Sequence, residues 1–275
     1  MSFKTADVVK LRKATGAGMM DCKNALKDAE GDFDRALEII REKGKLIANK
    51  RADREASEGV VLAKVTADNK FGAIVVLNCE TDFVAKNDNF VAFADRILNA
   101  ALENKVETLD ALKALELDGT SVETLVSQET GVIGEKLDLP YYKVITAEQV
   151  TAYIHPGNKL ATLVGFNKAD VDTAVAKDVA MQVAAMAPIA IDKDAIPQET
   201  IDKEIEIAKE KYRQEGKPEA MLDKIAQGSI NKWFKEVTLI NQTYVKDGKI
   251  SIKDFLKQND SELTVTAFDR YTLNV

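Results

Sequence analysis

One short stretch of the chain carries the residues best suited to contact another molecule. Residues 81–87 read Thr-Asp-Phe-Val-Ala-Lys-Asn, so a single large aromatic side chain, Phe83, stands among polar neighbours. Most loop aromatics fold back onto their own domain. The alternative is an exposed anchor for a partner, with the carboxylate of Asp82 beside it, since buried aromatic anchors dominate the energetics of protein interfaces. Spacing alone leaves both interpretations open.

The flanking segments predict where this stretch lies in the fold. Before it, Phe71–Leu77 is a short, strongly apolar, β-branched run bounded by Asn69 and Asn78, which predicts a buried strand. After it, residues 88–102 carry apolar side chains at spacings of three and four, which predicts the buried stripe of a helix. The stretch 81–87 therefore connects a strand to a helix.

Catalytic and metal-binding patterns are missing from the sequence. There is no nucleophile elbow, no Walker loop, no metal-ligand spacing and no Ser-His-Asp set. The single histidine, His155, precedes Pro156-Gly157 and is predicted to lie in a turn. Cys22 and Cys79 lack CxxC spacing, which predicts two reduced, half-buried thiols. We therefore expect no enzyme activity, no catalytic residue, no metal site and no cofactor.

Two motifs resemble signatures of the elongation factor Ts family, the guanine-nucleotide exchange factors of bacterial translation. One is the stretch 81–87. The other is Thr15-Gly-Ala-Gly-Met-Met-Asp-Cys-Lys-Asn-Ala-Leu26. They occur in the expected order and at about the expected separation, and the resemblance extends over essentially the whole chain, more weakly after Pro188.

The resemblance implies a protein partner. It implies that the chain binds the GDP-bound GTPase elongation factor Tu, disturbs the Mg²⁺ and phosphate site, and promotes GDP release so that GTP can rebind. In the family, the counterpart of Phe83 acts as a wedge between GTPase helices, and that of Asp82 perturbs contacts that support the metal. The residues assigned to this contact are Thr81, Asp82, Phe83, Val84, Ala85, Lys86 and Asn87.

Further partner contacts follow from the same resemblance. In the N-terminal region they are Gly16, Gly18, Met19 and Met20. Adjacent Met19 and Met20 cannot both face one helical core, so at least one should be exposed as an adaptable contact. In a later segment they are Met181 and Gln182, although Gln182 stands where some relatives carry His. A homodimer, giving a 2:2 complex with the partner, is left open.

The N-terminal region predicts a small helical unit. Residues 1–45 read as three short helices, the first capped by Thr5 and the third starting at Asp32 and ending at Gly44. A domain of this size resembles a ubiquitin-associated (UBA-like) fold. Residues 46–57 are charged and are predicted to link this domain to the rest.

An internal repeat follows. Residues 69–78 align with residues 158–167 at an offset of 89, and the preceding strands, 61–65 and 150–154, keep that offset. Each copy then enters an Ala-rich helix, so the repeated unit is a hairpin plus a helix over one sheet face. Only the first copy carries the aromatic motif. A fold needs its strands in both copies, so this asymmetry favours a functional Phe83.

These elements together predict an α+β fold. We expect a three-helix UBA-like N-terminal domain, then a duplicated core of two small antiparallel sheets covered by helices, with a projecting helical hairpin. Tyr141–Ile145 should complete the first sheet, and Leu263–Leu273 the second. The predicted segments are 1–45 (N-terminal domain), 46–57 (linker), 58–147 (first repeat), 148–198 with 236–275 (second repeat) and 199–235 (helical hairpin).

Composition narrows the class of protein. The 275 residues have a net charge of −7, with 38 basic and 45 acidic side chains intermixed, so no basic stripe favours direct nucleic-acid binding. No apolar run is long enough to span a membrane, and the N-terminal residues have no signal core, so we expect a cytoplasmic protein. The alternative to exchange is a structural or homodimeric interaction protein whose function does not depend on Phe83.

Overall fold

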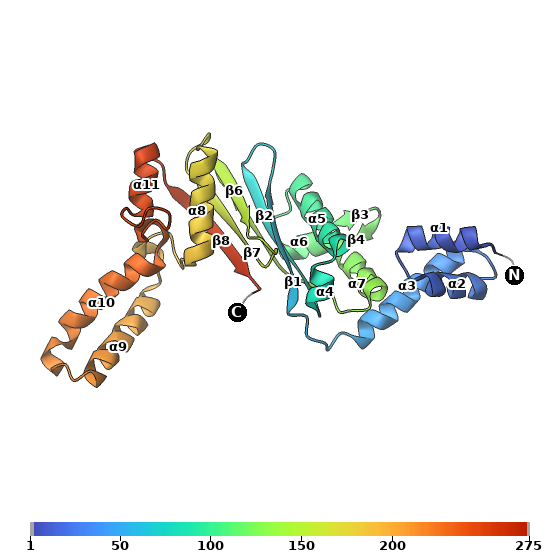
Figure 1. The fold of residues 1–275 in the computed structure, drawn as a ribbon, viewed down its shortest axis with the longest axis horizontal. Helices are drawn as coiled ribbons and strands as arrows, with labels where there is room; N and C mark the ends of the chain where they lie inside the picture. Colours follow the sequence, from blue (N-terminus) through green and yellow to red (C-terminus); the bar gives the residue numbers. More distant parts are fainter. Residues whose placement is uncertain (1–2, 274–275) are drawn as a thin grey trace.

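The computed structural model describes residues 3–273, which are arranged along one long axis (Figure 1). A unit of three helices lies at one end, two small antiparallel sheets with their covering helices lie in the middle, and a helical hairpin projects at the other end. The predicted α+β class is therefore confirmed. Residues 1–2 and 274–275, which begin the first and end the last predicted segment, lie outside the described residues. Among residues 3–273, no helix is long and apolar enough to cross a membrane.

The N-terminal unit packs three helices around a small core. They are α1 (Thr5–Thr15), α2 (Met19–Asp28) and α3 (Phe33–Lys50). Leu11, Cys22 and Leu26 are fully buried between them. The Cys22 thiol is thus buried, not half-buried as predicted.

The helix starts in this unit differ in how they are capped. Asp32 accepts a hydrogen bond from the Arg35 N–H and starts α3 as predicted. At α1 the N-cap position is occupied by Lys4, whose own N–H donates to the Asp7 carboxylate at 2.7 Å. The predicted cap at Thr5 is therefore wrong, because Thr5 is already the first helical residue.

Helix α3 does not end at Gly44, as its sequence predicted, but continues to Lys50. At Gly44 it crosses α7 (Val122–Ile133) so closely that a Cβ built on Gly131 would lie 2.3 Å from the Gly44 Cα. Glycine therefore serves close helix packing at this point and does not terminate the helix. The N-terminal unit is held against the rest of the chain by this crossing, and the start of the predicted linker is helical.

The first sheet has the order β1-β2-β5, with both pairs antiparallel. Its strands are β1 (Glu58–Val65), β2 (Phe71–Cys79) and β5 (Asp138–Thr146). Helix α5 (Asp88–Glu103) covers one face and buries Phe90 and Ile97 against strand residues such as Leu77. The predicted strand, helix and third strand are all confirmed, and the central strand, β2, leads into the aromatic motif.

The second sheet repeats this plan in the order β6-β7-β8. Its strands are β6 (Gln149–Ile154), β7 (Leu160–Phe166) and β8 (Val265–Thr272). Helix α8 (Thr173–Met186) packs on one face. Asn69 and Asn158, which the repeat aligns, both adopt a φ of 56° in the two hairpin turns. The predicted repeat and the late third strand are therefore present.

The two sheets pack face to face on the sides that α5 and α8 leave uncovered. The apolar residues in this layer include Val61, Ile74, Ile145, Val150 and Leu163. A polar contact also joins the two sheets here: the Tyr141 hydroxyl of β5 donates to the Asp269 carboxylate of β8 at 2.8 Å. Because both faces of the first sheet are covered, Val60 to Ala63 are all buried and β1 shows no alternation of buried and exposed side chains.

The remaining elements surround this core. They are α6 (Leu109–Ala114), β3 (Glu116–Leu117), β4 (Thr120–Ser121), α9 (Gln198–Gln214), α10 (Leu222–Val237), α11 (Ile252–Asn259) and the 3-10 turns Lys193–Ala195, Glu219–Met221 and Leu239–Asn241. Helices α9 and α10 form the predicted hairpin (Figure 1). Trp233 and Phe234 lie half-buried in the last part of α10, and their ring centroids are 5.4 Å apart.

Two glycine substitutions should have opposite effects on stability, because only one of the two glycines lies where α3 and α7 cross. Gly131→Ala should destabilise the protein by about 1–3 kcal/mol, because the new methyl group overlaps the Gly44 backbone. Gly228→Ala is the matched control, since Gly228 lies inside α10 with no atom within 4 Å of a built Cβ. It should stabilise by about 0.4–1 kcal/mol. Thermal melts of both variants test this, and a Gly131→Ala protein as stable as the parent would contradict the close crossing.

Candidate partner-binding site

The aromatic motif forms a single helical turn, α4 (Asp82–Ala85), between β2 and α5. The Thr81 side chain accepts a hydrogen bond from the Val84 N–H at 3.4 Å and starts α4. The Asn87 side chain accepts from the Asn89 N–H at 2.9 Å and starts α5. Each cap satisfies a backbone donor that the helix itself leaves unpaired. The chain is thus turned sharply by local hydrogen bonds.

Phe83 lies on the outer side of this turn. Its side chain is 83% exposed. Ala85 is buried and Val84 is half-buried on the inner side, and the core beneath is filled by Phe90, which is 2% exposed. The interpretation that Phe83 folds back onto the following helix is therefore wrong, because its own domain offers it no cover.

Asp82 lies beside Phe83 and is paired within the turn. Its carboxylate lies 2.6 Å from the Lys86 Nζ, one helical turn away. The hydrogen bond from Lys86, reinforced by its charge, holds the pKa of Asp82 below its usual value. Both side chains are well exposed, and a surface ion pair of this kind is weak. Asp82 is therefore ionised and free to exchange Lys86 for another partner.

Beneath the turn, Cys79 ends β2. Its thiol is fully buried and donates to the Thr81 carbonyl oxygen at 3.2 Å. Burial raises the pKa of this thiol to about 12, so it is neutral and not a nucleophile. The prediction of a half-buried thiol was wrong, since β2 is covered on both faces.

A polar network at the base of the turn was not found from the sequence. The Glu80 carboxylate accepts from Arg51, and Thr81 donates to Glu135, at sequence separations of 29 and 54 residues. No local pattern marks residues so far apart. Only the fold brings the end of α3 and the segment after α7 to the end of β2.

The N-terminal motif forms a second, separate surface. Gly16 has a φ of 69°, ends α1 and leads through Gly18 into α2. Met19 is 40% exposed and Met20 is 62% exposed, so both methionines meet solvent. Figure 1 shows α2 and α4 apart along the long axis, with α7 and the end of α3 between them. The two motifs are therefore not brought together in this structure.

The chain is similar to curated proteins along its whole length. It is 50% identical to elongation factor Ts of Azobacteroides pseudotrichonymphae, over 100% of both chains. It is 53% identical to elongation factor Ts of Christiangramia forsetii, over 98% of this chain and 97% of the relative. It is 49% identical to elongation factor Ts of Porphyromonas gingivalis, over 100% of this chain and 99% of the relative.

A model of the family described as Elongation factor TS matches residues 80–275. The chain belongs to the elongation factor Ts family. Membership places it among the elongation factors of protein biosynthesis. The family match begins at Glu80, so it includes the whole α4 turn, while the full-length relatives also cover the N-terminal unit.

In this member of the elongation factor Ts family, two residues of the second repeat were predicted to bind a partner. Their side chains differ in solvent accessibility. Met181 is half-buried, but Gln182 is fully buried. The Gln182 amide donates to the Thr243 carbonyl oxygen at 3.1 Å and accepts from the Val245 N–H at 3.0 Å. Gln182 therefore fastens the segment after α10 to α8, and it presents no surface to a partner.

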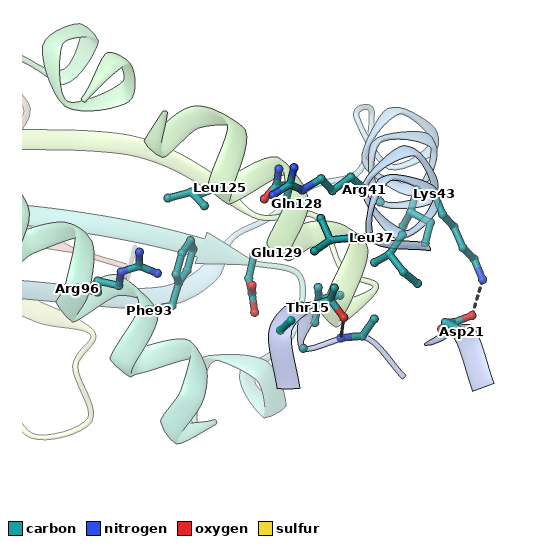
Figure 2. A pocket seen from close by; sticks show the side chains of 18 residues that line it. Thr15, Asp21, Leu37, Arg41, Lys43, Phe93, Arg96, Leu125, Gln128 and Glu129 are labelled. Carbon is teal, nitrogen blue, oxygen red and sulfur yellow. Dashed lines mark hydrogen bonds and ion pairs between the residues drawn. The ribbon is translucent and has the colours of Figure 1, made fainter. Parts of the chain in front are cut away.

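A cavity of about 330 Å³ lies between the N-terminal unit and the helices α5 and α7. Figure 2 shows the side chains around it, which include Thr15, Asp21, Leu37, Arg41, Lys43, Phe93, Arg96, Leu125, Gln128 and Glu129. Glu129 of α7 is half-buried there, and burial raises the pKa of its carboxyl above the ordinary value of 4.5. The junction of the N-terminal unit with the core of this family member thus contains a carboxyl group that resists ionisation.

The position of Glu129 predicts a dependence of stability on pH. The pKa of Glu129 is higher in the folded protein than in the unfolded chain. The contribution of this carboxyl to the stability of the fold is therefore complete at pH values below its pKa in the unfolded chain, and it is lost as the pH rises through its pKa in the folded protein. Relative to the parent, Glu129→Gln should therefore gain melting temperature between about pH 4.5 and neutrality. Glu55→Gln, at an exposed position, is the control. Thermal melts at several pH values that showed the same Glu129→Gln difference throughout would contradict this assignment.

Proposed function

We propose that this chain is a guanine-nucleotide exchange factor for elongation factor Tu. It binds the GDP-loaded GTPase, disturbs the Mg²⁺ and phosphate site, and promotes GDP release so that GTP can rebind, acting in the bacterial cytoplasm. Family membership supports the partner. The observation that carries the proposal is a Phe83 side chain that is 83% exposed on a capped turn. An aromatic ring held in water is unfavourable until a partner covers it.

The mechanism is differential binding. GDP and Mg²⁺ keep the loops around the nucleotide ordered in a GTPase. A factor that bound the loaded and empty forms equally well would shift nothing, so the empty form must be bound more tightly. In this proposal Phe83 enters between helices of the GTPase as a wedge, and the ionised Asp82 disturbs polar contacts that support the metal. The chain makes and breaks no covalent bond.

The other predicted contacts take graded roles in the proposal. Met19 and Met20 provide exposed, unbranched side chains that can adapt to a partner surface. Met181 contributes an edge contact from the second repeat. The remaining residues shape these surfaces: Gly16, Gly18, Thr81, Val84, Ala85, Lys86 and Asn87.

A second candidate function is association through the helical hairpin. Ile207 is 60% exposed and Met221 is 49% exposed on that hairpin, so it carries apolar surface of its own. A homodimer through the hairpin would give a 2:2 complex with the partner. If association were the whole function, activity would not depend on Phe83.

Substitution of Phe83 separates these functions. Phe83→Ala should cost less than about 1 kcal/mol of stability, as an exposed side chain, whereas a buried Phe truncated to Ala costs about 3–5 kcal/mol. Loss of an interface hot spot of about 2 kcal/mol or more should slow stimulated GDP release at least roughly tenfold. Stopped-flow release of a fluorescent GDP from elongation factor Tu, together with thermal melts, measures both effects.

Two further variants calibrate the result. Asp82→Ala should slow release less than Phe83→Ala, because Asp82 has a supporting electrostatic role. Asp170→Asn changes an exposed residue in the corresponding turn of the second repeat and keeps a side chain suited to its φ of 57°. It should leave release unchanged. Normal exchange by a folded Phe83→Ala protein would remove the support for the proposal.

A further inference from the structure

Thr81, the residue that starts the Phe83 turn, is held by a carboxylate from a distant part of the chain. The Thr81 N–H donates to Glu135 Oε2 at 3.0 Å, and the Thr81 hydroxyl donates to Glu135 Oε1 at 2.7 Å. Hydrogen bonds to an ionised acceptor are stronger than neutral ones, and a two-point contact also fixes orientation. Glu135 therefore fixes both the backbone and the side chain of Thr81.

The hydroxyl bond also affects the cap of α4. A threonine hydroxyl has one proton to donate and lone pairs to accept with. Because the Thr81 hydroxyl donates its hydrogen to Glu135, a lone pair of the hydroxyl oxygen is left to accept from the Val84 N–H at 3.4 Å. This cap is long for a hydrogen bond, so α4 depends on the stronger contact behind it.

The neighbouring residue, Glu80, is also held by residues from distant parts of the chain. Its carboxylate accepts from Arg51 at 2.7 Å and from the Lys136 N–H at 2.6 Å. The Lys136 N–H, followed by Arg51, lowers the pKa of Glu80, whose side chain is only 14% exposed. Lys136 in turn donates its Nζ to the Ala52 carbonyl oxygen at 2.8 Å. The pair Glu135-Lys136 thus ties the end of β2 to the segment that follows α3.

We propose that Glu135 is a positioning residue for nucleotide exchange, which holds Thr81 so that the α4 turn presents Phe83 in one orientation before the partner arrives. The inference rests on the proposed function of Phe83. A turn held in its binding conformation avoids the loss of backbone and side-chain freedom on association. Glu135 itself contacts no nucleotide and acts only through the turn.

The test uses the full chain and elongation factor Tu loaded with a fluorescent GDP. Release is followed by stopped flow over a range of factor concentrations, which gives a plateau rate and a half-saturating concentration. Glu135→Ala should lower the ratio of plateau rate to half-saturating concentration roughly five- to thirtyfold, the scale of re-ordering the backbone of one residue. Glu135→Gln keeps one acceptor oxygen for Thr81 and should fall between the parent and Glu135→Ala.

A double-mutant cycle distinguishes positioning from general loss of structure. If Glu135 acts mainly through Phe83, Glu135→Ala should have a much smaller effect in a Phe83→Ala background than in the parent, limited to what Asp82 on the same turn contributes. Lys168→Met is the matched control, because Lys168 lies just after β7 and makes a partly buried ion pair with Asp260 at 2.7 Å in the second repeat. Its exchange should equal that of the parent at temperatures where all variants are folded.

Each outcome bears on one claim. Full exchange by Glu135→Ala, or a Glu135→Ala effect that is equally large with and without Phe83, overturns the positioning role. If Glu135→Ala does not fold at the assay temperature, Glu135→Gln decides in its place, and parent-like exchange by that variant also overturns the role. If Phe83→Ala alone exchanges normally, the proposed function has failed, whatever Glu135 does.

Discussion

Neither three-stranded sheet can bury both of its faces alone, and their packing against each other is the constraint on which the structure depends. Helices α5 and α8 cover the outer faces, and the apolar layer containing Ile74, Ile145 and Leu163 fills the space between the sheets. Strand β2, central in its sheet, is consequently covered on both faces. The segment that follows β2 therefore begins at the end of a strand that is held by packing on both faces.

The α4 turn, at the end of this buried strand, exposes an aromatic ring. Its inner residue, Ala85, is buried, its ends are capped, and Phe90 occupies the core below, so Phe83 has no place inside. The second repeat has the same strands and helix but no aromatic motif at the end of β7. The duplication thus provides two similar scaffolds, of which one carries the exposed anchor and the other supports it.

Local patterns predicted most of the fold, because short apolar runs and helical periodicity reflect contacts that recur along the chain. They failed where a distant contact decides the outcome. Gly44 resembles a helix end, but the backbone near Gly131 makes it a crossing point. The family resemblance assigns Gln182 to a partner contact, but the segment after α10 buries it. Glu135 could not be identified at all, since it meets Thr81 across 54 residues.

The most direct measurement follows the solvent exposure of Phe83 during exchange. A fluorinated phenylalanine at position 83 gives a ¹⁹F resonance whose shift between H₂O and D₂O reports exposure. This solvent shift should be large for the free chain, disappear in the complex with nucleotide-free elongation factor Tu, and return when saturating Mg²⁺-GDP is added, because linkage requires GDP and the factor to weaken each other. A ring that stays exposed in the complex, or stays buried when GDP binds, would contradict the account.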